Sequence, residues 1–240
     1  MSDPVVRVHA LTKRYGTTEA VRGLSFELAP GRVLAMVGPN GAGKTTTLRA
    51  IAGIIQPTSG RTEVAGIGVQ SHPVAAKQRM AWVPHDPKLF DALTVLEHLE
   101  FVASAWGVRP FREAAMALLE RFDLSAKAHE VAQSLSTGMR QKLALCCAAL
   151  HTPDLLMLDE PMTGLDPRAI RTMKAWVADE AARGASVIVS SHLLGMVADV
   201  CTDLLILVHG EARFFGTLDE ARAQYGQTDL EALFFQATEA

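Results

Sequence analysis

The chain has 240 residues, 49% of them apolar, which is enough to bury the core of one large domain. Its formal net charge of −3 gives no sign of the basic surface that nucleic-acid-binding proteins use, which argues against nucleic acid as a partner. The sequence contains no apolar run near the roughly 20 residues that a membrane helix needs, and residues 1–7 lack the pattern of a secretion signal. The adjacent Cys146 and Cys147 are predicted to be reduced thiols of a cytosolic protein, because neighbouring side chains on a helix diverge too far for a disulfide.

The N-terminal segment is expected to form a small antiparallel sheet. In residues 5–10 the side chains Val5, Arg7 and His9 alternate with Val6, Val8 and Ala10, a weak period of two that is typical of an edge strand. Residues 12–16 are predicted to turn. Residues 24–28 are the next predicted strand, and a Pro-Gly turn then leads into a buried apolar strand over residues 33–37. We expect the small sheet to lie beside the core that this buried strand begins.

A glycine-rich segment follows the buried strand and matches the phosphate-loop pattern G-x-x-x-x-G-K-[ST] in full. Glycines let the backbone approach phosphate oxygens, and the helix predicted over residues 44–52 adds the positive end of its dipole. Lys44 is expected to reach the outer phosphates, and the Thr45 hydroxyl is expected to face a magnesium ion. The predicted nucleotide-binding residues of this loop are Gly38, Pro39, Asn40, Gly41, Ala42, Gly43, Lys44, Thr45 and Thr46. The alternative is a turn that binds nothing, whereas a dinucleotide fingerprint is excluded because Thr46 stands where its last glycine should be.

The middle of the chain is predicted to be an insertion of helices. Short strands are expected over residues 61–64 and 80–83, and prolines end the second one. Thr94 and Glu97 have the spacing of a capping box. The apolar positions that repeat with helical spacing are Leu96, Leu99, Val102 and Ala103, and then Ala114, Leu118 and Phe122. The block runs to about Leu150, which is too long for one crossover helix, so we expect a helical subdomain.

Two carboxylates follow the next apolar strand, predicted over residues 155–158. Asp159 and Glu160 stand at its carboxyl end, which is where open α/β sheets bind their ligands, so both should face the phosphate loop. We expect Asp159 to hold magnesium through its water shell and Glu160 to act as the general base for an attacking water, whereas the alternative is that the two carboxylates only form a solvated turn. A helix over residues 168–183 and strands over 186–190 and 204–209 complete an alternating α/β pattern.

Taken together, these motifs resemble the nucleotide-binding subunit of ATP-binding cassette (ABC) transporters, over nearly the whole chain and in that family's order. The resemblance implies a P-loop NTPase (RecA-like) α/β core with an N-terminal antiparallel β subdomain and an inserted α-helical subdomain. It assigns residues 1–85 and 151–215 to the core, 86–150 to the helical subdomain and 216–240 to a C-terminal tail, all within one ABC ATPase domain.

Residues 135–139 look like the family's signature segment LSGGQ. In that family the segment contacts the γ-phosphate held by a second subunit, so Ser136 and Gly138 are expected to bind nucleotide across a head-to-tail dimer. A hydroxyl and free N–H groups at a helix start suit an anion, although alone they form an ordinary helix cap. Thr137 and Met139 depart from the family pattern, so the contacts of Ser136 and Gly138 are the better supported ones.

Other single residues also look like parts of the family's site. Tyr15 is similar to the aromatic residue that stacks on adenine, although a tyrosine in a turn needs no ligand. Residues 164–167 resemble the D-loop, and His192 resembles the switch histidine that contacts the γ-phosphate. His85 stands where the family has a metal-sensing glutamine, so it either enters the metal site, which would favour manganese, or turns outward while a water completes the shell. The catalytic residues that the resemblance implies are Lys44, Glu160 and His192.

The resemblance implies a cytoplasmic subunit, peripheral on the inner face of the cell membrane, that binds and hydrolyses ATP with Mg²⁺. Closure of a homodimer or heterodimer of such subunits would drive a separate integral-membrane permease, which is expected to dock on residues 86–110. The short C-terminal segment and the residues of the phosphate-loop and signature motifs look most like those of the export-type (ABC-2-like) branch. The alternative is a soluble ABC-type ATPase acting as a mechanical or regulatory module on the ribosome or chromosome, but heptads and a second phosphate loop are missing from the sequence. A regulator without turnover is disfavoured by Glu160.

Overall fold

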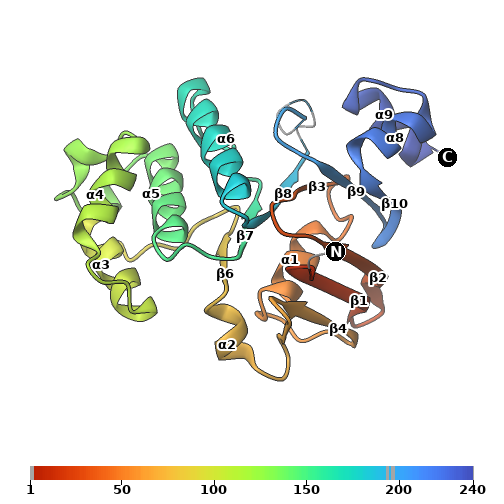
Figure 1. Cartoon of the computed structure of the whole chain (residues 1–240), viewed down its shortest axis with the longest axis horizontal. Coiled ribbons are helices and arrows are strands. Elements are labelled where there is room, and N and C mark those ends of the chain that lie inside the picture. The colour runs from red at the N-terminus through yellow and green to blue at the C-terminus, as the bar shows by residue number, and fades with distance from the viewer. Residues whose placement is uncertain (1–2, 193–194, 196–197, 240) are drawn as a thin grey trace.

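The computed structural model describes residues 3–192, 195 and 198–239. The N-terminal part of the chain forms an antiparallel sheet from β1 (Val6–Tyr15), β2 (Thr18–Leu28), β4 (Ser59–Val64) and β5 (Ile67–Gly68). The strand order is β2-β1-β4-β5, and this sheet lies at the lower right of Figure 1. The predicted N-terminal sheet is therefore present.

The second sheet is larger and mostly parallel. Its strands are β3 (Val33–Val37), β6 (Met80–Val83), β7 (Leu155–Asp159), β8 (Ser186–Ser191), β9 (Asp203–Val208) and β10 (Glu211–Thr217). They are ordered β10-β9-β3-β8-β7-β6, with β10 antiparallel to β9 and all other neighbours parallel. Because β3 and β7 flank β8, the phosphate loop and the two acids leave the same edge of the sheet on either side of one strand.

The helices cover both faces of this parallel sheet. They are α1 (Lys44–Ile51), α2 (Pro73–Lys77), α3 (Val95–Trp106), α4 (Arg112–Arg121), α5 (Thr137–Ala149), α6 (Pro167–Ala182), α8 (Leu218–Tyr225) and α9 (Leu230–Glu239). Side chains of β3 alternate between two cores: Val33 and Ala35 join the core with α3 to α6, and Leu34 and Met36 join the core with α1 and the antiparallel sheet. A strand buried on both faces reads as a continuous apolar run, as β3 does.

Two expectations for the N-terminal strands were wrong. β1 is not an edge strand, because it pairs with β2 on one side and β4 on the other. Residues 12–15 continue the strand instead of turning, and β2 begins at Thr18, well before residue 24. The physical reason is a series of register shifts between Val8 and Arg14, with Ala10 at a φ of 46°. Such bulges break the period of two on which the sequence pattern depends.

The helices α3, α4 and α5 gather at the left of Figure 1. The capping box of α3 is confirmed, since the Glu97 N–H donates to Thr94 Oγ1 (3.2 Å) and the Thr94 N–H donates to Glu97 Oε2 (2.7 Å). In α4 the buried side chains are Ala115 and Leu119, whereas Ala114 is exposed, so the predicted apolar face was shifted by one position. The third predicted apolar position, Phe122, lies just beyond the end of α4 and is buried, with its ring packed edge-on against Trp176 of α6.

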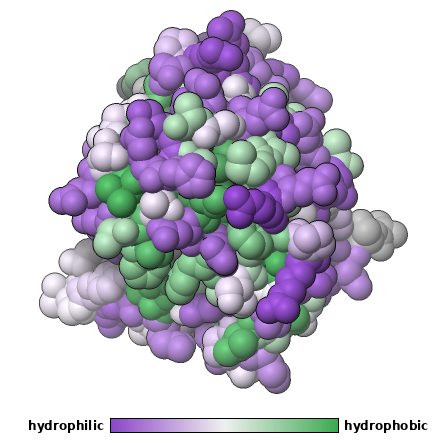
Figure 2. All heavy atoms as spheres, turned by 90° about the vertical axis from the view of Figure 1, so that its left-hand side faces the viewer, coloured by the Kyte–Doolittle hydropathy of each residue, from purple (hydrophilic) through white to green (hydrophobic). Residues whose placement is uncertain are grey.

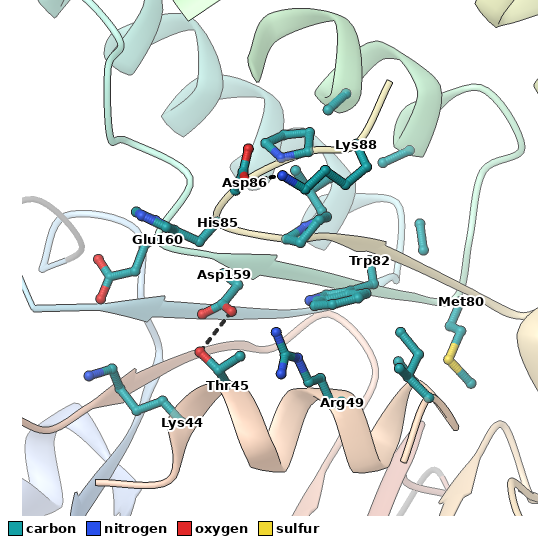
Figure 3. A pocket seen from close by; sticks show the side chains of 18 of the residues that line it. Lys44, Thr45, Arg49, Met80, Trp82, His85, Asp86, Lys88, Asp159 and Glu160 are labelled. Atoms are coloured by element: carbon teal, nitrogen blue, oxygen red, sulfur yellow. Dashed lines mark hydrogen bonds and ion pairs between the residues drawn. The ribbon is translucent and has the colours of Figure 1, made fainter. Parts of the chain in front are cut away.

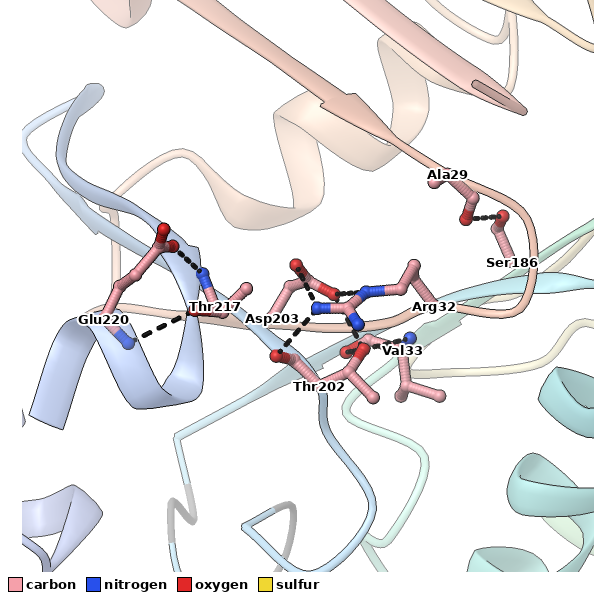
Figure 4. A network of polar contacts seen from close by, with 8 residues as sticks. All are labelled: Ala29, Arg32, Val33, Ser186, Thr202, Asp203, Thr217 and Glu220. Carbon is pink, nitrogen blue, oxygen red and sulfur yellow. Dashed lines mark hydrogen bonds and ion pairs between the residues drawn. The ribbon is translucent and has the colours of Figure 1, made fainter. Parts of the chain in front are cut away.

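An ion-pair network fixes the end of the parallel sheet that lies opposite the phosphate loop (Figure 4). Arg32 donates to both carboxylate oxygens of Asp203, at 2.7 and 3.0 Å, and so joins the start of β3 to the start of β9. The Ser186 hydroxyl, at the start of β8, donates to the Ala29 carbonyl oxygen (2.9 Å). Polar side chains at this end therefore serve to align strands.

Candidate functional site

A cavity of about 1380 Å³ opens at the carboxyl ends of β3 and β7 (Figure 3). One part is walled by the phosphate loop, the ends of β7 and β8, and the segment that follows β6. The other part runs along β6 to α3 and α5, where the lining is aromatic and apolar. The predicted site residues that line this cavity are Tyr15, Asn40, Gly41, Ala42, Gly43, Lys44, Thr45, Thr46, His85, Asp159, Glu160 and His192.

Only glycine fits the backbone of the phosphate loop at Gly43. Gly43 has a φ of 104°, and a Cβ there would lie 2.4 Å from the Ala20 carbonyl oxygen. Gly43 is also the N-cap of α1 and offers no side chain as a cap, so the first N–H groups of the helix have no side-chain acceptor from that position. An uncapped helix start that faces a cavity is a site for an anion.

Lys44 places a cation inside this loop. Its side chain is 7% exposed, and Nζ donates to the carbonyl oxygens of Gly38 (2.6 Å) and Pro39 (3.3 Å). Burial lowers the pKa of Lys44, and the negative charges of Glu160 and Asp159 act in the opposite direction. A desolvated ammonium group with neutral partners gains more from a bound anion than an exposed one does, which suits a phosphate group.

The hydroxyl of Thr45 meets the carboxylate of Asp159. Thr45 Oγ1 donates to Asp159 Oδ2 (2.9 Å), and Ser190 Oγ donates to Asp159 Oδ1 (2.6 Å). Asp159 is 1% exposed, at the end of a strand whose other residues are all apolar. Hydroxyl and carboxylate oxygens are hard ligands, so this donor set fits Mg²⁺ at the mouth of the phosphate loop. Within the described part of the chain no group of three His, Cys, Asp or Glu side chains forms a metal cluster, so phosphate oxygens and water would supply the remaining ligands.

Glu160 and His192 form a polar pair beside the acid strand. His192 Nδ1 lies 2.8 Å from Glu160 Oε2, and the His192 backbone N–H donates to the same oxygen (3.3 Å). Glu160 has a φ of 51°, a conformation that side chains with a Cβ adopt rarely and that turns the carboxylate away from the strand. The pair places a carboxylate, already oriented by an imidazole, in the same cavity as Lys44.

The two less specific sequence assignments also reach the cavity. Tyr15 is 47% exposed, and the Lys13 ammonium group lies 5.0 Å from the centre of its ring. A base could therefore stack on the ring without displacing core side chains. His85 is exposed on the segment after β6, and among the described residues no hydrogen bond joins its ring to Asp159 or Thr45.

The predicted signature segment lies outside the cavity. Ser136 is exposed and caps α5, accepting a hydrogen bond from the Met139 N–H (3.3 Å). A Cβ on Gly138 would lie 2.5 Å from the Gly164 carbonyl oxygen, so the signature helix and the predicted D-loop are in backbone contact. The structure thus brings Lys44, Thr45, Asp159, Glu160 and His192 together and leaves Ser136 and Gly138 apart from them.

Sequence reasoning missed two features of this cavity. Ser190 holds Asp159, and its signal was a polar residue at the end of an apolar strand two positions before His192. The aromatic wall includes Phe90, from the segment before α3, and Phe101 and Trp106 of α3, which could be grouped only after folding.

Comparison with known proteins decides the family. The sequence pattern of the family described as ABC transporter matches residues 21–163. The ABC-type transporter ATP-binding protein EcsA of Bacillus subtilis (strain 168) is 34% identical over 238 residues, which cover 98% of this chain and 96% of that protein. The chain belongs to the ABC transporter family.

Two further comparisons agree with this assignment. The Nod factor export ATP-binding protein I of Burkholderia pseudomallei (strain K96243) is 36% identical to this ABC transporter subunit, over 88% of this chain and 70% of that protein. A solved structure described as the ATP-binding subunit of an ABC transporter superposes with a TM-score of 0.93 at 31% identity, over 97% of this chain and 99% of that one.

These findings confirm the expected fold class and the expected function. The chain is an ABC transporter ATP-binding subunit and an ATPase, and the ribosome or chromosome alternative is not favoured by its relatives. ABC transporter subunits of this kind work with membrane permease components. No helix in residues 3–192, 195 and 198–239 combines the length and apolar character needed to cross a bilayer.

Proposed function

We propose that this ABC transporter subunit hydrolyses ATP in the cavity between Lys44 and Glu160, with Mg²⁺ held by Thr45 and Asp159. The observation that carries the proposal is the hydrogen bond from Thr45 Oγ1 to Asp159 Oδ2 (2.9 Å), which joins the phosphate-loop helix to the acid strand. That bond fixes Glu160, the next residue along the chain, at the same cavity as the buried ammonium group of Lys44.

Each residue then has one role in the reaction. Lys44 and the N–H groups at the start of α1 bind the outer phosphates, and Glu160 accepts a proton from the attacking water as its oxygen bonds to the γ-phosphorus. The bond to the bridging oxygen breaks and ADP leaves. His192 orients the Glu160 carboxylate through the 2.8 Å contact, and from the same cavity it would donate to a γ-phosphate oxygen. Bound magnesium would neutralise charge on the β- and γ-phosphate oxygens.

We further propose that the site is completed by a second subunit in a head-to-tail dimer. Ser136 is exposed at the start of α5 and lies outside the cavity, so within one chain its hydroxyl has no phosphate to bind. A hydroxyl that accepts the Met139 N–H retains its own hydrogen for donation to a phosphate oxygen of the partner's nucleotide. Ser136 and Gly138 would make this contact in a homodimer or in a heterodimer with a related subunit.

The proposed membrane partner is a permease subunit that inserts a cytoplasmic segment into the apolar part of the cavity. Phe90, Phe101 and Trp106 are 55%, 52% and 42% exposed there, although aromatic side chains of this size are usually buried. Figure 2 shows the molecule from the side of α3 and α4, and apolar side chains gather across the middle of that face. An apolar patch next to the nucleotide cavity suits a partner that must respond to ATP. Docking on a permease in this way would place the subunit at the inner face of the membrane. The transporter would belong to the export-type branch.

The test is the charge-neutral substitution Glu160→Gln. It keeps the phosphate and metal contacts but removes the base, so ATP hydrolysis should fall by roughly 100- to 10,000-fold while ATP affinity stays within a factor of a few. With ATP bound and not hydrolysed, the variant should also accumulate as a dimer in size-exclusion chromatography. Turnover equal to wild type would contradict the role of Glu160, and a monomer at saturating ATP would contradict a site shared between two copies of this chain.

A further inference from the structure

Ser190 occupies a special place in the sheet. It is fully buried in β8, where it pairs with Met36 of β3 on one side and with Asp159 of β7 on the other. β8 is therefore the strand that separates the phosphate-loop strand from the acid strand. The preceding three residues of β8 are apolar, so a hydroxyl at position 190 is a polar group placed inside a core.

The Ser190 hydroxyl uses its hydrogen and a lone pair on two neighbouring residues. Its Oγ donates to Asp159 Oδ1 (2.6 Å) and accepts from the Glu160 backbone N–H (3.1 Å). The Glu160 N–H also lies 3.2 Å from the Ser190 carbonyl oxygen, so it is shared between side chain and backbone of the same residue. One side chain thus holds both acidic residues at the end of β7.

These contacts fix groups that the strand alone would not hold. Asp159 Oδ2 accepts from Thr45, so the hydroxyls of Thr45 and Ser190 bind opposite oxygens of the carboxylate and set its rotation. Glu160 has a φ of 51°, which is unfavourable for a residue with a Cβ and needs support from its surroundings. The hydrogen bond from its N–H to Ser190 is such a support.

We propose that Ser190 is a positioning residue for ATP hydrolysis, which orients the carboxylate of Asp159 and the backbone of Glu160 with one hydroxyl. This inference rests on the proposed roles of Asp159 and Glu160. Ser190 lines no part of the cavity, so it acts through these two residues and not on the nucleotide. Partners that orient a metal-binding carboxylate commonly change metal affinity or activity by about 10- to 100-fold when they are removed.

Ser186 supplies a matched control in the same strand. It is also fully buried in β8, and its hydroxyl donates a hydrogen bond to a neighbouring segment, to the Ala29 carbonyl oxygen (Figure 4), whereas the Ser190 hydroxyl both donates and accepts. It lies at the opposite end of the strand from Asp159 and Glu160. Removing either hydroxyl should cost similar stability, so a difference in catalysis between the two positions measures positioning and not folding.

The experiment compares Ser190→Ala, Ser190→Cys, Ser186→Ala and Ser186→Cys in the full chain. Ser190→Ala should lower kcat by about 10- to 100-fold, while its affinity for ATP in EDTA should stay within twofold of wild type, because the phosphate contacts remain. Ser190→Cys, with a weaker donor of similar size, should give an intermediate kcat. Both Ser186 variants should keep kcat within twofold of wild type. An equal loss of kcat at both positions, or a wild-type kcat in Ser190→Ala, would overturn the proposal.

A binding measurement adds a readout that does not depend on turnover. Mn²⁺ titrated into protein saturated with ADP, followed by electron paramagnetic resonance, should bind about tenfold more weakly to Ser190→Ala than to wild type or Ser186→Ala. Affinity for ADP in EDTA should be equal in all three proteins. Equal Mn²⁺ affinities would remove the role of Ser190 toward Asp159. Glu160→Gln, measured in parallel, distinguishes failure of the proposed function from failure of the role of Ser190. If Glu160→Gln keeps wild-type turnover, the proposed function fails. If Glu160→Gln is inactive and Ser190→Ala keeps wild-type turnover, only the role of Ser190 fails.

Discussion

The N-termini of α1 and α5 are both predicted from the sequence to bind nucleotide phosphate, yet they lie in different surroundings. The start of α1 has no side-chain cap from Gly43 and faces a cavity that also holds Asp159 and Glu160. The start of α5 is capped by Ser136 and is exposed outside that cavity. One anion site is assembled within the chain, and the other is presented at its surface.

This difference shows how a nucleotide site can be divided between two chains. The half around α1 needs a buried cation, a metal-binding acid and a base at fixed positions, which a packed sheet edge supplies. The half around α5 needs only N–H groups and a hydroxyl that reach a phosphate from outside. Gly138 contacts the backbone of Gly164, so this exposed half is still held rigidly by the chain that carries it.

The largest effect expected on the α1 side is that of Lys44→Ala. Loss of a charge-assisted hydrogen bond to phosphate should weaken ATP binding by about 10- to 100-fold, corresponding to roughly 1.5–3 kcal/mol. Isothermal titration in EDTA measures this affinity without turnover. Glu160→Gln serves as the control, since it should keep its affinity, and equal affinities of Lys44→Ala and wild type would show that the α1 side is not the primary phosphate site.

A smaller effect is expected where the proposed docking segment meets α5. Arg140 donates to Asp91 Oδ1 and to the Ala132 carbonyl oxygen, both at 2.9 Å, and so ties the segment after β6 to the signature helix. Half-exposed ion pairs contribute about 0.2–1 kcal/mol, so Asp91→Asn should lower permease-stimulated ATPase activity by roughly two- to fivefold with ATP affinity unchanged. Glu130→Gln, which breaks the exposed pair with Lys127, is the control. Equal permease-stimulated ATPase activities of the two variants would show that the contact between Arg140 and Asp91 does not couple the docking segment to α5.

The smallest expected effect concerns His85 and the metal. An imidazole is a better ligand for manganese than for magnesium, so a His85 ring that enters the metal shell would raise the ratio of Mn²⁺- to Mg²⁺-supported ATPase rates. His85→Gln should lower that ratio toward magnesium. The ATPase rates of both proteins with each metal measure it, and identical ratios would leave His85 outside the metal shell.

The sequence predicted the elements whose signal is local. The phosphate loop, the acid strand and the capping box of α3 each depend on adjacent residues, and all lie where they were expected. The predicted edge strand and turn failed because register shifts near Ala10 carry a strand through Tyr15. The apolar residues of α4 are spaced so that either of two neighbouring helix faces could be buried. Packing against the other helices buries the face that carries Ala115.

Residues that act through partners distant in sequence were not predictable in the same way. Ser190 is 31 positions from Asp159, and nothing in β8 itself indicates that their side chains meet. Parallel pairing of β7 with β8 creates that contact, and pairing depends on the whole sheet. The aromatic wall of the cavity likewise requires α3 to lie beside β6 before its residues form one surface.

The most direct test of the divided site mixes two inactive variants. Ser136→Arg keeps the phosphate loop and should bind ATP like wild type, and Lys44→Ala keeps the signature segment, but neither alone should hydrolyse ATP. In a head-to-tail dimer of one chain of each kind, one of the two sites combines an intact Lys44 with an intact Ser136. An equal mixture should therefore regain up to about a quarter of the wild-type ATPase rate per chain, because half of the dimers are mixed and each has one working site. No recovery at any mixing ratio, with both variants folded and Ser136→Arg still binding ATP, would contradict a site shared between two copies of this chain.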